Sequence, residues 1–292
     1  MKILTRREDI RILISDSAYA PFVARVRPSL LAKVRGWQKR GAEVTFICST
    51  EAKKFYQKEL PGVVFFTFPF AWKGKTRWTV PLEFIRANLL IFPFIFKVRG
   101  KFDIVYSLTS TLDMVFFPWV LKLLDQKVRW FTMMDNLVPK PSERPGNYIL
   151  KVIPYLAFLI ANLLLKKADG MFVVTNLLKQ YYEKKGMKVI KTGTGNGLDI
   201  DSFSGKIDPK TPRFTALFGG RLHPAKGIFD LVAITKEIVK RNKNYTLGMM
   251  GPGDYKTINK LLEVIKTNNL FKNIFLLGDK NTKERWDLYR KS

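Results

Sequence analysis

The sequence predicts an α/β fold made of two doubly wound, Rossmann-like domains. Short runs of apolar and β-branched residues alternate with longer segments of helical periodicity along the whole chain. Several of the short runs are apolar on both faces, which is typical of parallel strands covered by helices on each side. A polar stretch with glycine and proline, 204–213, interrupts this alternation and indicates a linker between the domains.

This linker places a first domain at 1–203 and a second at 214–292. The expected strands are 10–15, 43–48, 63–68, 103–108, 128–133 and 170–175 in the first domain, and 213–218, 245–250 and 273–278 in the second. The second domain has roughly half the length of a usual doubly wound domain. We therefore expect it to be incomplete.

The intervening segments have helical periodicity. In 22–40 one apolar stripe recurs at three- and four-residue steps, with Arg25, Arg35 and Lys39 on the opposite face. The segment 152–165 is apolar throughout, but it is shorter than the ~20 residues that a membrane span needs. It is expected to be a helix buried between layers.

The charge of the chain is strongly positive. It has 51 Lys and Arg residues against 24 Asp and Glu, a net charge of +27, which favours nucleic acid or an anionic membrane surface as a partner. Lipid contact is predicted in helix 22–40 and in 70–78, where aromatic residues alternate with cations. The single cysteine, Cys48, allows no intrachain disulfide and favours a cytoplasmic location.

The segment GGRLHPAKG, residues 219–227, follows an expected strand and precedes an expected helix. Its two glycines would let a ligand approach the backbone, and Arg221 and Lys226 would place two cations beside a helix N-terminus. A diphosphate suits this arrangement, and a turn with two solvated cations is the alternative. The segment is neither a Walker motif nor a G-x-G-x-x-G fingerprint.

Several segments resemble GT-B glycosyltransferases of the family-4 type, which are retaining and depend on nucleotide sugars. GGRLHPAKG resembles their G-R-L-x-x-x-K-G element, and four further segments follow the family's order: ADGMFVVTNLLKQYYEKKG (168–186), GTGNGLDIDSF (193–203), LGMMGPGD (247–254) and NIFLLGDKNTKERWDLYRKS (273–292). The resemblance implies a GT-B fold, a nucleotide-diphospho-sugar as co-substrate, and no metal ion or other cofactor.

The resemblance also assigns residues. Arg221 and Lys226 would hold the donor's diphosphate and stabilise its growing charge, with Asp135 as a third catalytic residue. His223, inside the same loop, would be a neutral bystander, and contact with the donor is the alternative. The remaining candidates are Gly219, Gly220, Gly251, Gly253 and Gly278 at the donor, and Asp16, Ser17, Tyr19 and Asn136 on the acceptor side.

The sequence departs from the family in three places. The stretch after the first strand, 15–29, lacks the family's glycines, and Met134 in MMDNLVP stands where the family has histidine. The family's E-x7-E motif is absent, because the family places it downstream of the point that this sequence reaches. We therefore expect a C-terminally truncated piece of a longer enzyme.

These observations predict a glycosyltransferase that moves a sugar, with retention, to a lipid-linked or polysaccharide acceptor. Its expected location is peripheral, at the cytoplasmic face of the cell membrane. The alternative is a non-catalytic basic α/β protein that binds nucleic acid or acts as a membrane scaffold. The sequence has no RNP, KH, zinc-knuckle or helix-turn-helix pattern, which counts against nucleic acid.

Overall fold

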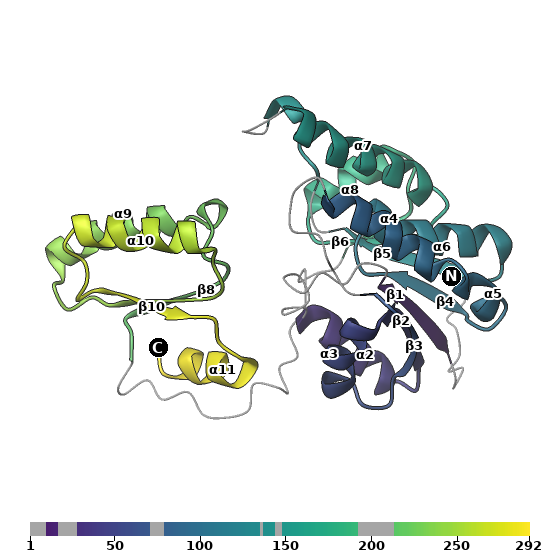
Figure 1. The fold of residues 1–292 in the computed structure, drawn as a ribbon, viewed down its shortest axis with the longest axis horizontal. Coiled ribbons are helices and arrows are strands. Elements are labelled where there is room, and N and C mark those ends of the chain that lie inside the picture. Colours follow the sequence, from purple (N-terminus) through teal and green to yellow (C-terminus); the bar gives the residue numbers. More distant parts are fainter. Residues whose placement is uncertain (1–9, 17–27, 71–78, 135–136, 144–147, 192–212) are drawn as a thin grey trace. The chain divides into compact units, whose positions relative to one another are not determined.

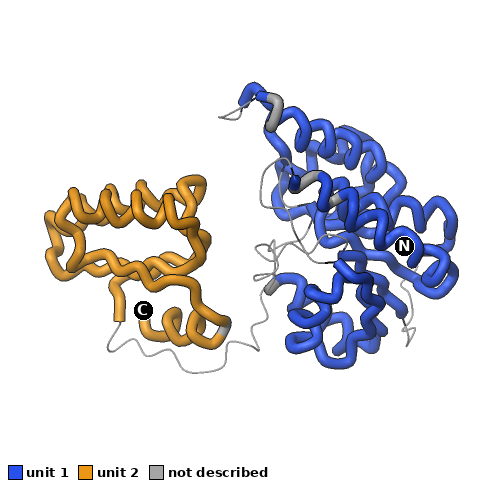
Figure 2. The backbone as a smooth tube through the Cα atoms, in the orientation of Figure 1, with its two compact units in different colours: residues 1–199 blue, residues 200–292 orange. Residues whose placement is uncertain are grey.

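A computed structural model describes residues 10–16, 28–70, 79–134, 137–143, 148–191 and 213–292 of the chain. The chain forms two compact units, Met1–Asp199 and Ile200–Ser292 (Figure 1, Figure 2). Their boundary falls inside 192–212, outside the described residues, so the linker and the exact domain limits stay predictions.

The first unit is built on a seven-stranded sheet in which every paired neighbour is parallel. Its order is β3-β2-β1-β4-β5-β6-β7, so the direction of winding reverses between β1 and β4. In open α/β sheets, such a reversal is where ligands bind, beyond the carboxyl ends of the strands. The strands are β1 (Arg11–Asp16), β2 (Glu43–Ser49), β3 (Val64–Phe68), β4 (Ile104–Ser107), β5 (Arg129–Met134), β6 (Gly170–Val173) and β7 (Val189–Lys191).

Helices cover both faces of this sheet. Leu13 packs into the core under one helical layer and its neighbour Ile14 into the core under the other, which is why both faces of β1 are apolar. One layer contains α2 (Pro28–Gln38) and α3 (Thr50–Glu59). The other contains α4 (Thr79–Ile91), α5 (Phe94–Val98), α6 (Leu112–Leu124), α7 (Tyr148–Leu165) and α8 (Asn176–Glu183), and a short helix, η1 (Pro141–Glu143), precedes α7.

The second unit has a three-stranded parallel sheet of order β10-β9-β8. Two helices pack on one face of this sheet and a third packs on the other (Figure 1). In chain order the elements are β8 (Ala216–Gly219), η3 (Pro224–Lys226), α9 (Ile228–Arg241), β9 (Leu247–Met250), α10 (Tyr255–Thr267), β10 (Ile274–Gly278) and α11 (Thr282–Arg290). The predicted α/β fold with two Rossmann-like units is confirmed.

All nine expected strands are present, and β7 is an additional one. The expectation for 152–165 is confirmed for the helix, which is part of α7, but it is wrong for the burial between layers. The α7 side chains Phe158 and Ala161 are buried in the core, whereas Leu156 and Leu163 are 51% and 63% exposed. No helix in the described part of the chain is long and apolar enough to cross a membrane.

The structure tests only part of the predicted lipid-contact segments, and it bears on two of their residues, Phe70 and Arg35. Phe70 is buried beneath the guanidinium of Arg86, which lies 4.4 Å from its ring centre, so it cannot reach headgroups. Arg35 pairs with Glu59 at 3.3 Å and also donates to the Glu59 carbonyl, because α2 and the end of α3 lie side by side. Arg25 and 71–78 lie outside the described residues.

Candidate functional site

The predicted donor-side glycines gather at the carboxyl edge of the second sheet. Because β8, β9 and β10 are parallel, all three strands end at this edge. The Gly220 N–H donates to the Met250 carbonyl at 3.0 Å, and the Gly251 N–H donates to the Gly278 carbonyl at 2.9 Å. The turns that follow the three strands are therefore adjacent.

Internal packing requires several of these glycines. A Cβ at Gly251 would lie 1.8 Å from the Gly220 carbonyl oxygen, and the residue has a φ of +140°. A Cβ at Gly219 would lie 2.1 Å from the hydroxyl of Tyr289 on α11. From the sequence, Gly219 and Gly220 were expected to let a ligand approach the backbone. The structure shows that the protein's own side chain occupies the space beside Gly219.

The loop after β8 is anchored at Leu222, which lies between Arg221 and Lys226 in the sequence. Leu222 is buried in the core under α9 and α10, and its N–H donates to the Pro252 carbonyl at 2.8 Å. The His223 Nδ1 accepts from the Ala225 N–H at 3.2 Å and so caps η3. His223 therefore helps to shape the loop, a role that sequence reasoning missed.

Arg221 and Lys226 are exposed on this anchored loop. Neither forms an ion pair or a side-chain hydrogen bond with any described residue. Two other cations of the same edge are already matched by carboxylates, since Arg285 pairs with Asp279 at 3.0 Å and Lys280 with Glu284 at 4.0 Å. The charges of Arg221 and Lys226 are thus available to an external anion.

Asp254 adds one negative charge to this edge. It caps α10, accepting from the Thr257 N–H at 2.9 Å and from the Thr257 hydroxyl at 2.6 Å. These hydrogen bonds lower the pKa of Asp254, with a smaller contribution from His223, so the carboxylate stays ionised at neutral pH. The turns after β8 and β9 therefore carry the two cations, Arg221 and Lys226, and this one carboxylate.

The predicted acceptor-side residues lie in the first unit. Asp16, at the end of β1, is fully buried, and its Oδ2 accepts from the Tyr56 hydroxyl at 2.9 Å. Met134 is also buried, and its sulfur accepts from the Ser110 hydroxyl at 2.8 Å. Ser17, Tyr19, Asp135 and Asn136 lie outside the described residues, so their roles stay predictions.

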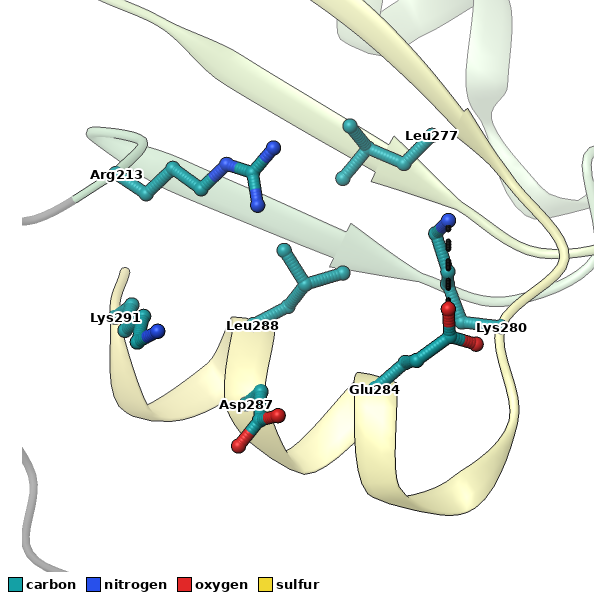
Figure 3. Close-up of a pocket in the computed structure, with 7 residues that line it drawn as sticks. All are labelled: Arg213, Leu277, Lys280, Glu284, Asp287, Leu288 and Lys291. Atoms are coloured by element: carbon teal, nitrogen blue, oxygen red, sulfur yellow. Dashed lines mark ion pairs between the residues drawn. The ribbon is translucent and has the colours of Figure 1, made fainter.

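Sequence reasoning also missed a cavity of about 240 Å³ on the α11 side of the second sheet. Figure 3 shows Leu277 and Leu288 facing each other, with Arg213 toward one end and the Lys280–Glu284 pair toward the other. Its volume is below the roughly 300–1,000 Å³ of typical ligand pockets. The loop with Arg221 and Lys226 is the better candidate site.

No protein-family model matches the sequence, and no curated protein matches it. Solved structures do share its fold. Sucrose-phosphate synthase from Thermosynechococcus elongatus has a TM-score of 0.65 at 14% identity, over 98% of this chain and 74% of that chain. HepE from Anabaena, solved with UDP, has a TM-score of 0.59 at 14% identity, over 93% and 70%.

A third structure, UDP-GlcNAc 2-epimerase from Methanocaldococcus jannaschii, has a TM-score of 0.56 at 13% identity, over 96% of this chain and 76% of that chain. Similarity at this level of identity shows the fold alone. The fold is the GT-B type, which the glycosyltransferases among these structures share. The epimerase shows that the same fold also serves another reaction on nucleotide sugars.

Proposed function

We propose that the protein is a glycosyltransferase that takes a sugar from a nucleotide-diphospho-sugar and transfers it with retention of configuration. The proposed acceptor is lipid-linked or a polysaccharide, at the cytoplasmic face of the membrane. The nucleotide sugar is a co-substrate, and the proposed mechanism uses no metal ion.

One observation carries this proposal. Two exposed cations without carboxylate partners in the described residues, Arg221 and Lys226, lie on an anchored loop at the carboxyl edge of a parallel sheet. In this type of fold, ligands bind beyond that edge. Structures of the same fold contain UDP, or UDP and glucose, as in HepE.

The chemistry gives the two cations separate tasks. Cleavage of the bond between sugar and phosphate leaves additional negative charge on the nucleoside diphosphate. Cations fixed in advance stabilise that charge as it develops, without having to reorganise during the reaction. The planar fork of Arg221 can bind two phosphate oxygens at once, whereas Lys226 supplies a point charge.

Calorimetric titration with UDP, GDP and their sugars tests the proposal directly. We expect binding to be lost or strongly weakened in Arg221→Ala and Lys226→Ala, and kcat/KM for transfer to fall ~100-fold or more, as it does when a charge-stabilising donor is removed. Lys226→Arg should have a higher kcat/KM than Lys226→Ala but a lower one than wild type, because the planar guanidinium cannot replace a point charge at the same reach. Lys236→Ala, which removes an exposed cation in the middle of α9, is the matched control and should behave as wild type.

The structure makes His223 a second control. His223→Asn keeps a side-chain acceptor for the η3 cap, whereas His223→Ala removes it, so the asparagine variant should retain more binding. Near-wild-type rates for Arg221→Ala and Lys226→Ala would contradict the donor site. Release of an epimerised nucleotide sugar, with no transfer to any acceptor, would contradict glycosyl transfer.

A further inference from the structure

Two helices of the first unit expose continuous apolar stripes. On α4 the stripe is Leu82, Ile85 and Leu89, and on α7 it is Leu156, Ile160 and Leu163. Their exposed fractions run from 49% to 70%. The spacings of three, four and seven residues place each set on one side of its helix. We call these six residues the apolar face.

Both stripes face away from the sheet on the same side of the unit. The inward residues Ala87 and Ile91 of α4 and Phe158 and Ala161 of α7 belong to one core, which also contains Leu13 of the sheet. Figure 1 shows α4, α6 and α7 on the same side of the sheet. Because the inward sides of α4 and α7 already pack into the core, the outward stripes are not needed to build the core of this unit.

Single exposed leucines are ordinary on soluble proteins, but sets of large aliphatic side chains on two helices that both pack against α6 mark an interaction surface. The charges near the apolar face indicate what binds there. Lys97, Arg99 and Lys101 lie in and beyond α5, Lys166 and Lys167 directly follow α7, and all five are exposed.

Negative charge is nearly absent from the same segments. Glu83 is the single carboxylate in 79–101 and 148–167, and Arg86 binds it at 2.6 Å. Asp125 also reaches this region, since it accepts from the Gly100 N–H at 2.7 Å, but the five exposed cations outnumber it. The partner is therefore apolar where it meets the stripes and anionic around them. A second copy of this chain fits poorly, because each copy has a net charge of +27 and the two would repel.

We propose that the apolar face docks on an anionic lipid bilayer. The leucine and isoleucine side chains enter the boundary between headgroups and acyl chains, ~5–10 Å deep, with α4 and α7 lying along the surface. The lysine and arginine residues after α5 and α7 contact the headgroups. This surface takes the place of Phe70 and Arg35 in the predicted lipid contact, whereas Arg25 and 71–78 lie outside the described residues and stay predictions. It gives the proposed membrane location a physical basis, yet it does not depend on sugar transfer.

Vesicle flotation tests the docking. The protein should float with vesicles of equal parts phosphatidylglycerol and phosphatidylcholine, and at least tenfold less with phosphatidylcholine alone or in 0.5 M salt. The double variant Leu89→Gln with Leu163→Gln should lower partitioning about tenfold or more, because two of the most exposed apolar side chains no longer enter the lipid.

The matched control is Ile234→Gln with Leu262→Gln, which removes two exposed apolar side chains from α9 and α10 of the other unit. It should float as wild type does, and all variants should keep the wild-type circular dichroism. Equal flotation of the two double variants would overturn the assignment, as would equal binding to neutral and anionic vesicles. Both outcomes are independent of nucleotide-sugar binding.

A fluorescent label locates the surface without removing it. Cys48 is the single cysteine, it is fully buried, and burial raises the pKa of its thiol, so an introduced cysteine is labelled selectively. A polarity-sensitive dye at Leu163→Cys should shift to the blue on anionic vesicles, whereas the same dye at Leu262→Cys should not. A shift at Leu163→Cys that follows protein concentration without vesicles would overturn the proposal in favour of a second copy.

Discussion

Replacing Gly251 by alanine should disrupt the carboxyl edge of the second sheet. The new Cβ would lie 1.8 Å from the Gly220 carbonyl oxygen and 2.7 Å from its carbonyl carbon, so backbone and not a flexible side chain stands in the way. To admit the methyl group, the turns after β8 and β9 must separate by more than an ångström. That movement breaks the hydrogen bonds from Gly220 to Met250 and from Gly251 to Gly278, now 3.0 and 2.9 Å long.

The size of the effect follows from these contacts. Two backbone hydrogen bonds contribute about 1 kcal/mol each, and a φ of +140° costs an alanine about 1–3 kcal/mol, so the expected destabilisation is about 3–5 kcal/mol. Gly278 is the matched control. It also has a positive φ, +70°, but no atom of the described residues lies within 4 Å of its missing Cβ, so Gly278→Ala should cost only about 1–2 kcal/mol.

Hydrogen exchange read by mass spectrometry on peptides of the second unit would separate the two variants. Amides of β9 and β10 should lose far more protection in Gly251→Ala than in Gly278→Ala, while peptides of the first unit should exchange at wild-type rates. Equal protection of β9 in both variants would refute the reasoning, because the backbone contact would then tolerate a methyl group.

Two other predictions concern the first unit. Ser107→Ala should lower the free energy of unfolding by about 1–3 kcal/mol, since it leaves the buried Trp130 Nε1–H without its 2.7 Å acceptor. Ser15→Ala removes a buried hydroxyl that has no hydrogen-bond partner among the described residues, so it should cost nothing measurable by urea denaturation. Burial, aided by the Asp16 carboxylate, raises the pKa of the Cys48 thiol. The protonated thiol therefore stabilises the folded state in full below the unfolded thiol's pKa of about 8.5, and this stabilisation is lost as the pH rises above that value. Urea denaturation from pH 7 to 10 should show a decline that Cys48→Ala lacks, and rapid reaction of the native thiol with Ellman's reagent at pH 8 would contradict the burial.

The strands were predictable because a parallel strand covered on both faces needs side chains that are apolar on both faces. Runs such as β1 and β2 meet that condition along almost their whole length. The strand β7 has only three residues, which are too few for an apolar pattern to show, so it was not predictable. The loop with Arg221 and Lys226 was predictable because its strand, turn and helix follow one another directly in the chain.

The lipid-contact residues were not predictable in this way. Whether Arg35 is solvated depends on Glu59, which lies 24 residues away and is brought close only by the packing of α2 and α3. Whether an apolar helix is buried all round depends on how many neighbours the fold supplies. For α7 the fold covers only one side, and the sequence of an apolar helix does not record which side stays uncovered.

At the carboxyl edge of the second sheet, the glycines and the two cations Arg221 and Lys226 differ in how strongly they indicate nucleotide binding. Gly251 is required by the close approach of the Gly220 carbonyl, so it would be needed even in a sheet edge that binds nothing. A turn that only connects β8 to α9 would not need two cations without carboxylate partners. Arg285 and Lys280 show that this edge can match a cation with a nearby carboxylate, yet no described carboxylate pairs with Arg221 or Lys226. Because both cations lie on a loop whose backbone is anchored at Leu222, they support the proposed diphosphate site more strongly than the glycines do.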